Sequence, residues 1–272
     1  MGNNCLVHAC SKNNIQIIKY LIEEIGMNIN LRNNSNKNLF LYVCCNKDSH
    51  VVKYFIEKKK ISESIYKDNN DGLMFAFKNS NINIIKYLFD ISNKNLDYTD
   101  YNEDNYLIMA AKNPDINVIK YCIEILNMDV HYRGKNGDNC LAAACRSNSN
   151  IKVVKYLLNI LRNLNFTNFY DDNYLICSAE NPNPKILKFL IEEMGMKITY
   201  TNQKVENCLL RAFIVNNFKT IKYLVENHNM DIKFKDRFGN SILQYLFRYC
   251  NINIIKYFIG EKIIDIDYEK KK

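Results

Sequence analysis

One short phrase recurs along this chain and constrains its fold more than any other feature. It usually consists of two aliphatic residues, a lysine, an aromatic residue and two further apolar residues, as in IIKYLI from Ile17. Neighbouring copies are 33 to 35 residues apart, a period that is typical of stacked repeats. The lysines of the eight copies are Lys19, Lys53, Lys86, Lys120, Lys155, Lys188, Lys222 and Lys256. We therefore expect residues 1–272 to form a single solenoid of eight repeats without an inter-domain linker.

Each repeat opens with a residue that is suited to begin a helix. These positions, near which the repeats start, are Asn4, Asn38, Asp71, Asn105, Asn139, Asn173, Asn207 and Ser241. Their side-chain oxygens can accept a hydrogen bond from a free amide in the first helical turn. An apolar residue follows two positions later, and small residues often come next, as in CLAAAC at 140–145. This pattern predicts a short first helix that packs closely against its neighbours.

The recurring phrase itself predicts the second helix of each repeat. In the first repeat Ile17 and Leu21 fall on one helical face, which we expect to be buried, and Lys19 and Glu23 fall on another. The polar break between the two helices is often Asn, Ser or Pro, and Asn tolerates a left-handed turn better than most residues. We therefore expect a tight turn there.

A polar connection of about ten residues ends each repeat, a length that is unusual unless the loop has a role of its own. One position in it is mostly aromatic and holds Tyr98, Tyr132, Phe166, Tyr200, Phe234 and Tyr268. In one interpretation these rings are exposed in a row and bind a partner. We favour the alternative, in which each ring packs against the neighbouring repeat.

Two stretches carry a resemblance to a known family. DIKFKDRFGNSIL at 231–243 and KNGDNCLAAAC at 135–145 resemble the hairpin and helix start of the ankyrin repeat, through Gly239, Ser241 and Leu243 in the first of them. The resemblance implies an all-α ankyrin-repeat solenoid of helix-turn-helix units with β-hairpin-like loops. The family's T-P-L-H motif is absent, which leaves the shape of the turns open. A tetratricopeptide array of similar period would need longer helices and shorter loops.

Two further features refine this resemblance. The average step is one residue longer than is usual for the family, and we expect the extra residue to extend the second helix, as Ile25 does in LIEEIGMNIN. The pattern N-x-L…A-C followed by I-I-K-Y-L-I-E-E looks most like the ankyrin proteins of giant amoeba-infecting viruses.

Catalysis, cofactors and metals find no support in the residue pattern. The chain has no Gly-rich phosphate loop, and His8, His50, His131 and His228 occupy four different repeat positions. No CxxC pair occurs, so we interpret the ten cysteines as reduced core residues rather than zinc ligands. We therefore expect no enzymatic activity, no cofactor and no metal.

Targeting features are equally weak. No apolar run is long enough for a transmembrane helix and no signal peptide is visible, so we expect a cytoplasmic protein (in the host cell if it is viral), with the nucleus as an alternative. Gly2 and Cys5 fit a lipidation motif, but Leu6 stands where the motif needs Ser or Thr.

The net charge of +8 raises the alternative of nucleic-acid or acidic-surface binding. Six of the eight recurring lysines have an acidic residue four positions later, one helical turn away on the same face. The excess charge comes largely from Lys58–Lys60 and Lys270–Lys272. We interpret these as solvated ends and expect nucleic-acid binding to be the weaker hypothesis.

The function that this pattern favours is binding of another protein by a non-catalytic monomer, through a concave groove and the hairpin tips. The tips differ between repeats although nothing in the fold demands their residues, which is how a repeat array encodes a specific partner. The candidate contact residues are Arg32, Tyr101, Arg133, Lys135, Phe169, Tyr170, Gln203, Lys235, Arg237 and Phe238. The partner is unidentified, and would be a host protein if the viral resemblance holds. A third hypothesis is a redundant member of a repeat family without a dedicated partner.

Overall fold

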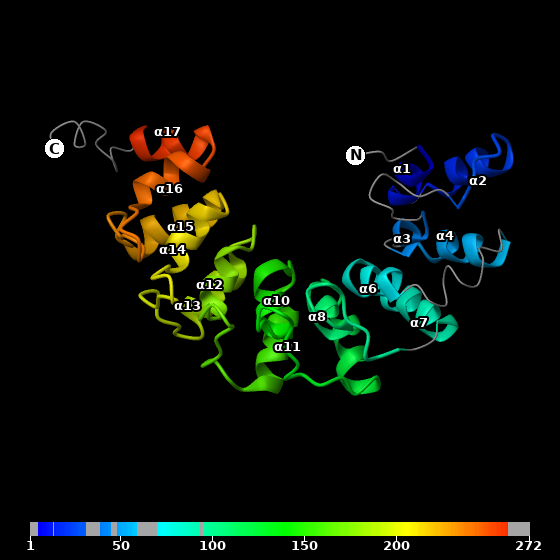
Figure 1. Ribbon diagram of the computed structural model, residues 1–272, viewed down its shortest axis with the longest axis horizontal. Coiled ribbons are helices and arrows are strands. Elements are labelled where there is room, and N and C mark those ends of the chain that lie inside the picture. Colours follow the sequence, from blue (N-terminus) through cyan, green and yellow to red (C-terminus); the bar gives the residue numbers. More distant parts are fainter. Residues whose placement is uncertain are drawn as a thin grey trace. The chain divides into compact units, whose positions relative to one another are not determined.

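The computed structural model describes residues 5–12, 14–30, 39–44, 48–58, 70–92 and 95–260. Every helix in these ranges belongs to a helix pair, and none of the ranges contains a named strand (Figure 1). The all-α repeat architecture expected from the sequence is therefore confirmed. The chain divides into two compact units, Met1–Lys135 and Asn136–Lys272, which are described separately below.

The described residues of the unit Met1–Lys135 form four helix pairs. The first helices of the pairs are α1 (Cys5–Ser11), α3 (Leu39–Cys44), α6 (Asn70–Asn79) and α8 (Tyr106–Ala111). The second helices are α2 (Ile15–Glu23), α4 (Ser49–Lys53) with η1 (Tyr54–Lys58), α7 (Ile82–Ile91), and α9 (Ile116–Lys120) with η2 (Tyr121–Ile125). Each first helix packs on the first helix of the next pair, which places the small side chains between neighbouring repeats.

The unit Asn136–Lys272 repeats the same arrangement. Its first helices are α10 (Cys140–Ser147), α12 (Tyr174–Ala179), α14 (Cys208–Ile214) and α16 (Ile242–Tyr249). Its second helices are α11 (Ile151–Leu161), α13 (Lys185–Glu192), α15 (Phe218–His228) and α17 (Ile252–Gly260). All six residues of CLAAAC in α10 are buried, so α10 and α12 approach each other closely.

The helix starts largely follow the sequence pattern. The expected cap accepts a hydrogen bond from the amide three residues later at Asn105, Asn139, Asn173, Asn207 and Ser241. Asn4 and Asn38 lie outside the described residues. The expectation for Asp71 is wrong, because α6 already begins at Asn70.

The extra residue of the repeat does not lengthen the second helix as expected. In the first repeat α2 ends at Glu23, and the amide of Ile25 donates to the carbonyl of Tyr20, five residues earlier (3.1 Å). The segments η1 and η2 use the same wide, π-type hydrogen bonding. A π-type turn inserts one residue while the rest of the helix keeps its buried face, and this is the physical reason for the difference.

Within each unit, the recurring Lys-Tyr phrase joins neighbouring second helices. In the first unit the ammonium groups of Lys19, Lys53 and Lys86 lie 5.8, 5.8 and 5.5 Å from the ring centroids of Tyr54, Tyr87 and Tyr121. The tyrosine hydroxyl in turn donates to the glutamate of the preceding phrase, as Tyr257 does to Glu226 (2.7 Å) in the second unit. The expected pairing of lysine and acid within one helix also occurs there, between Lys222 and Glu226 (3.6 Å).

Asparagines in the turns between the paired helices connect one repeat to the preceding one. The side-chain amide of Asn181 donates to the carbonyls of Cys145 (3.0 Å) and Asn148 (2.8 Å). Asn113 and Asn217 each donate to two carbonyls of their preceding repeats in the same way. The expected left-handed turn occurs at Asn216 (φ 59°), but these buried asparagines act mainly as hydrogen-bond donors between repeats.

The nine cysteines that lie within the described residues are free thiols, and seven of them are buried. Burial raises the pKa of Cys10 and of Cys208 to about 12, which keeps both thiols protonated at neutral pH. Within the same ranges, no helix combines the length and the apolar composition that a membrane span requires.

Candidate functional site

Four of the hairpin tips between repeats are each built around one polar side chain. In the tip at 168–172 the side-chain oxygen of Asn168 accepts hydrogen bonds from the amides of Tyr170 and Asp172, both at 2.9 Å. A backbone bond from Asn168 to the carbonyl of Asp172 (3.1 Å) closes the loop. Asp100, Asn202 and Asp236 hold the corresponding tips by the same two side-chain bonds. These four tips therefore have a defined backbone conformation, whereas the tip at 134–138 has Gly134 in the same position.

The fourth residue of each of the five described tips is in the left-handed conformation. The residues are Glu103, Gly137, Asp171, Val205 and Gly239, with φ of 57°, 78°, 64°, 58° and 81°. A β-branched residue is rarely found in this region because its side chain clashes with the backbone. Val205 is therefore strained, and its conformation is maintained by the hydrogen bonds of the surrounding tip.

Three pairs of consecutive tips are joined by a backbone hydrogen bond. The amide of Lys135 donates to the carbonyl of Asn102 (2.8 Å), and that of Phe169 to Asn136 (3.0 Å). Arg237 makes the equivalent bond to Lys204 (3.0 Å). These bonds fix the spacing of the exposed side chains along the row of tips.

The aromatic position at the start of the loops has a structural role. The hydroxyls of Tyr132 and Tyr200 donate to the carbonyls of Glu103 (2.7 Å) and Asp171 (2.9 Å) in the preceding tips. Phe166 is 4% exposed and its ring stacks on that of Tyr174, with centroids 4.6 Å apart. The interpretation that these rings pack against their surroundings is confirmed at these positions, while Tyr268 lies outside the described residues.

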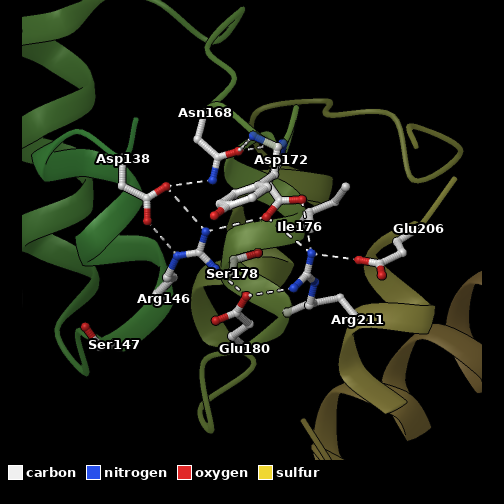
Figure 2. Close-up of polar contacts among 12 residues, drawn as sticks. Asp138, Arg146, Ser147, Asn168, Asp172, Ile176, Ser178, Glu180, Glu206 and Arg211 are labelled. Carbon is white, nitrogen blue, oxygen red and sulfur yellow. Dashed lines mark hydrogen bonds and ion pairs between the residues drawn. The ribbon is translucent and has the colours of Figure 1, made fainter. Parts of the chain in front are cut away.

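A network of charged side chains supports the tips of the second unit from the side of the first helices (Figure 2). Arg146, on α10, pairs with Asp138 (2.9 Å), with Asp172 (3.6 Å) and with Glu180. Asn168, which holds the tip described above, also donates to Asp138 (2.8 Å). The network therefore connects the hairpin directly to α10 and α12.

A second arginine extends the network to the next repeat. Arg211, on α14, pairs with Asp172 (3.1 Å), Glu206 (2.7 Å) and Glu180 (3.6 Å). The side chain of Asp172 is only 3% exposed and lies between the two guanidinium groups (Figure 2). A buried carboxylate that keeps its charge needs such partners, so the hairpins are rigidly connected to the helices.

The composition of this network is unbalanced. Four carboxylates face two guanidinium groups, which leaves a formal surplus of two negative charges. Within the ranges that the structure describes, no three His, Cys, Asp or Glu side chains are placed to hold a metal ion. The ion pairs with Arg146 and Arg211 and the hydrogen bond from Asn168 to Asp138 position the tips by electrostatic contacts.

One recurring feature of the sequence corresponds to this network. An acidic residue directly precedes the helix cap in four consecutive repeats, at Asp104, Asp138, Asp172 and Glu206. In the first unit, Asp104 pairs with Lys112 (2.8 Å) at the end of α8, as Asp138 does with Arg146 in the second. The recurrence of an acid before the cap is the pattern that could have predicted the network.

Nine of the ten predicted contact residues are exposed, and Arg32 lies outside the described residues. The exposed residues are Tyr101, Arg133, Lys135, Phe169, Tyr170, Gln203, Lys235, Arg237 and Phe238. The exposed fraction reaches 85% for Tyr101, 77% for Phe238 and 62% for Phe169. In the second unit the structure also places Lys204, which the sequence argument did not select, 6.0 Å from the ring centroid of Tyr170.

The chain consists of stacked helix pairs, and the loops between them are hydrogen-bonded to one another. This arrangement defines a repeat protein built from pairs of helices. A family model that represents three copies of the ankyrin repeat matches residues 1–64, 40–125, 73–168, 107–202 and 175–271. The chain belongs to the ankyrin repeat family. No curated protein matches it. Ankyrin repeats are a general protein–protein interaction module, and proteins built from them are generally non-catalytic scaffolds.

Proposed function

We propose that this chain is a non-catalytic binding module that holds an acidic segment of a partner protein against the hairpin tips of residues 136–260. The observation that carries the proposal is a row of exposed aromatic and basic side chains on tips with fixed backbones. Variable tips on a constant framework are the usual location of specificity in a repeat array.

The aromatic side chains supply the contact area. The exposed fractions of the side chains are 62% for Phe169, 48% for Tyr170 and 77% for Phe238. These residues lie on two tips, each of which is joined to the preceding tip by a backbone hydrogen bond. A large ring with few rotatable bonds loses little entropy on binding, and such residues often dominate the free energy of binding. Exposed rings on rigid loops are therefore well suited to receive a partner.

The charges on the same tips favour an acidic partner. Lys204, Lys235 and Arg237 are exposed, whereas Asp171 is half-buried. The carboxylates of the network beneath the tips are less exposed and are paired with Arg146 and Arg211. A partner that approaches the tips therefore meets positive charge first, which steers association and fixes orientation.

A peptide-display selection tests this function. We expect the wild-type chain to enrich sequences that contain acidic residues, and the Phe169→Ala/Phe238→Ala variant to lose at least about tenfold in affinity for them. The matched control is Ile160→Ala, which removes an exposed aliphatic side chain from α11, away from the tips. Enrichment that survives the double tip substitution would contradict the proposal.

Nucleic-acid binding is the second candidate, and the net charge of +8 favours it. Lys59, Lys60 and Lys270–Lys272, which supply much of that charge, lie outside the described residues. The affinity of the chain for a nucleic acid would fall steeply with salt, because the logarithm of the binding constant decreases linearly with the logarithm of the salt concentration. A titration of the chain with a random oligonucleotide at several salt concentrations therefore separates the two candidates.

The narrower resemblance to repeat proteins of giant viruses extends the proposal. On that basis the partner would be a host protein, and the site of action the cytoplasm of the infected cell. Proximity labelling in that cell tests this part. If it returns no reproducible partner that depends on Phe169 and Phe238, the hypothesis of a redundant repeat protein is favoured.

A further inference from the structure

We propose that a carboxylate of the partner protein binds to the backbone amide of Gln203 and to the ammonium group of Lys204. This assignment rests on the function proposed above and places the recognition of the acidic side chain on one tip, at 202–206. Two observations carry it: a gap in the hydrogen bonds that join the tips of the second unit, and a lysine without an ion pair beside that gap.

The backbone hydrogen bond between consecutive tips is absent at Gln203. At the equivalent position of the next tip, the amide of Arg237 donates to the carbonyl of Lys204 (3.0 Å). By the same pattern the amide of Gln203 would donate to the carbonyl of Tyr170, but within the described part of the chain neither group has a hydrogen-bond partner. Because Gln203 is exposed, its amide is open to a ligand.

The gap is a fixed feature of the second unit, because buried side chains join the two tips beneath it. The side-chain amide of Asn202 donates to the carboxylate of Asp172 (2.7 Å). Arg211 pairs with Asp172 (3.1 Å) on one tip and with Glu206 (2.7 Å) on the other (Figure 2). The tips therefore keep their relative position although their exposed backbones are not bonded to each other, and the amide of Gln203 is held in place for a ligand.

The conformation of the tip does not depend on the amide of Gln203. The side-chain oxygen of Asn202 accepts hydrogen bonds from the amides of Lys204 (3.0 Å) and Glu206 (2.9 Å), and the amide of Val205 donates to the carbonyl of Asn202 (2.9 Å). Gln203 is therefore the second residue of a β-turn whose hydrogen bonds all come from its neighbours. Proline is favoured at this position of a turn, so the amide hydrogen can be removed without removing the turn.

Lys204 supplies a positive charge next to this amide. Its ammonium group forms no ion pair within the residues that the structure describes, and it lies 6.0 Å from the ring centroid of Tyr170. A cation that is this far from an exposed ring is held weakly, so the lysine can turn to a ligand at small cost. The nearest acidic residue in the sequence, Glu206, is buried and paired with Arg211, and it does not compete for Lys204.

A carboxylate is the ligand that fits these two groups. It accepts hydrogen bonds and donates none, and a bond from a backbone amide to an ionised oxygen is stronger than a bond between neutral groups. A neutral amide side chain would keep the hydrogen bond to Gln203 but lose the attraction to Lys204. The tip therefore favours Asp or Glu over Asn or Gln in the partner.

Two variants isolate the contribution of the amide. Gln203→Pro and Gln203→Ala both lack the glutamine side chain, but only the proline variant lacks the amide hydrogen. For the acidic peptide that the display selection enriches most, we expect Gln203→Pro to bind at least about tenfold more weakly than Gln203→Ala. Equal affinities would overturn the assignment, while the proposed function would still stand on the loss caused by Phe169→Ala/Phe238→Ala. If no acidic peptide is enriched, both are overturned.

Arg237→Pro is the matched control for the fold. It changes the same turn position but removes an amide that is bonded to the carbonyl of Lys204, so it should lower the melting temperature. Gln203→Pro should leave the melting temperature at or above the wild-type value, because it removes no internal hydrogen bond and restricts the unfolded chain. A fall as large as that of Arg237→Pro would show that the amide of Gln203 is not free, and would overturn the assignment.

The peptide itself tests the charge. Each acidic residue is replaced in turn by its neutral amide, and the replacement that weakens binding to the wild type most should weaken binding to Lys204→Met by a smaller factor. Equal factors would mean that Lys204 does not contact the carboxylate. Tighter binding of a peptide with phosphoserine at that position would assign the site to a phosphate instead, and would overturn the carboxylate as its ligand.

Discussion

The ammonium group of Lys188 lies 4.4 Å from the centroid of the Tyr223 ring, which belongs to the next repeat. The same geometry joins Lys155 to Phe189 at 4.6 Å. In six of the repeats the lysine therefore contacts the repeat that follows, and the aromatic residue that receives it contacts the repeat before. A cation above an aromatic face is attracted by the ring quadrupole. This relationship gives a physical reason for the recurrence of the Lys-Tyr phrase, which periodicity alone leaves unexplained.

Lys188→Met tests the contribution of this contact to stability. The substitution keeps most of the aliphatic chain and removes the charge, so we expect a loss of about 0.5–1 kcal/mol in the free energy of unfolding, measured in urea. The coupling to Tyr223 follows from a double-mutant cycle with Tyr223→Leu. Lys185→Met, at the exposed first residue of the same helix, is the control. A coupling energy of zero would show that the Lys-Tyr contact does not stabilise the array.

Asn181→Ala tests the buried amides that connect the repeats. The substitution removes two donors and leaves the carbonyls of Cys145 and Asn148 without these hydrogen bonds, inside the protein. We expect a loss of about 2–4 kcal/mol, since each buried acceptor that is left unpaired costs about 1–3 kcal/mol. Asn227→Ala, at an exposed position of α15, should change stability by less than about 0.5 kcal/mol. Equal effects at both positions would contradict the role that we assign to Asn181.

Much of the fold could be predicted from the sequence because it depends on short-range patterns. The cap at Asn139 and the buried face that contains Leu141 follow from residues close to each other along the chain. The role of Asn181 could not be predicted in this way. Its side chain is equally suited to a left-handed turn and to a hydrogen bond, and the carbonyls that decide between them lie 33 and 36 residues away.

The candidate site was accessible to sequence reasoning only in part. The exposure of Phe169 and Phe238 was expected, because nothing in the fold demands these side chains. The network around Asp172 was missed since Arg146 and Arg211 stand at different positions of their helices, so that periodicity gives no reason to pair them. Which tip residues contact a partner depends on the partner's surface, and the sequence of this chain does not contain that information.

Val205→Asn should increase stability. Val205 has a φ of 58°, which is costly for a β-branched residue, whereas asparagine tolerates this region. We expect a gain of about 1 kcal/mol in the free energy of unfolding. Val215 is a close control because it is 39% exposed, against 37% for Val205, but has a φ of −92°. If Val215→Asn gives the same gain, relief of backbone strain is not the cause.

The hydrogen bond from Tyr245 to Asp236 (2.6 Å) makes stability depend on acid pH. Burial raises the pKa of Asp236, but hydrogen bonds from Tyr245, Asn240 and backbone amides outweigh it and lower the pKa below its ordinary value of 3.8. The folded protein therefore binds this proton more weakly than the unfolded chain does. The resulting stabilisation is present above pH 3.8 and is lost as the pH falls through the lower folded pKa.

Tyr245→Phe removes one of these hydrogen bonds. We expect the variant to be about 1 kcal/mol less stable than the wild type at neutral pH, as measured by urea unfolding. The difference should shrink as the pH falls below 3.8 and through the lower folded pKa of Asp236, where this carboxylate becomes protonated. Tyr249→Phe, on the same helix, serves as the control. A difference that is the same at neutral and at acid pH would show that the hydroxyl does not act through the charge of Asp236.

Gly137 and Gly239 occupy the same tip position, but only the first lies beneath an aromatic ring. A Cβ atom on Gly137 would come within 2.7 Å of Cδ1 and 2.8 Å of the backbone nitrogen of Phe169, whereas one on Gly239 would meet nothing within 4 Å. Gly239→Ala should therefore cost only the left-handed conformation, about 1 kcal/mol. Gly137→Ala should cost about 2–4 kcal/mol in urea unfolding, because the Phe169 tip must also move. Equal losses would mean that this tip shifts freely, and the rigid row of tips on which the proposed binding surface depends would lose its support.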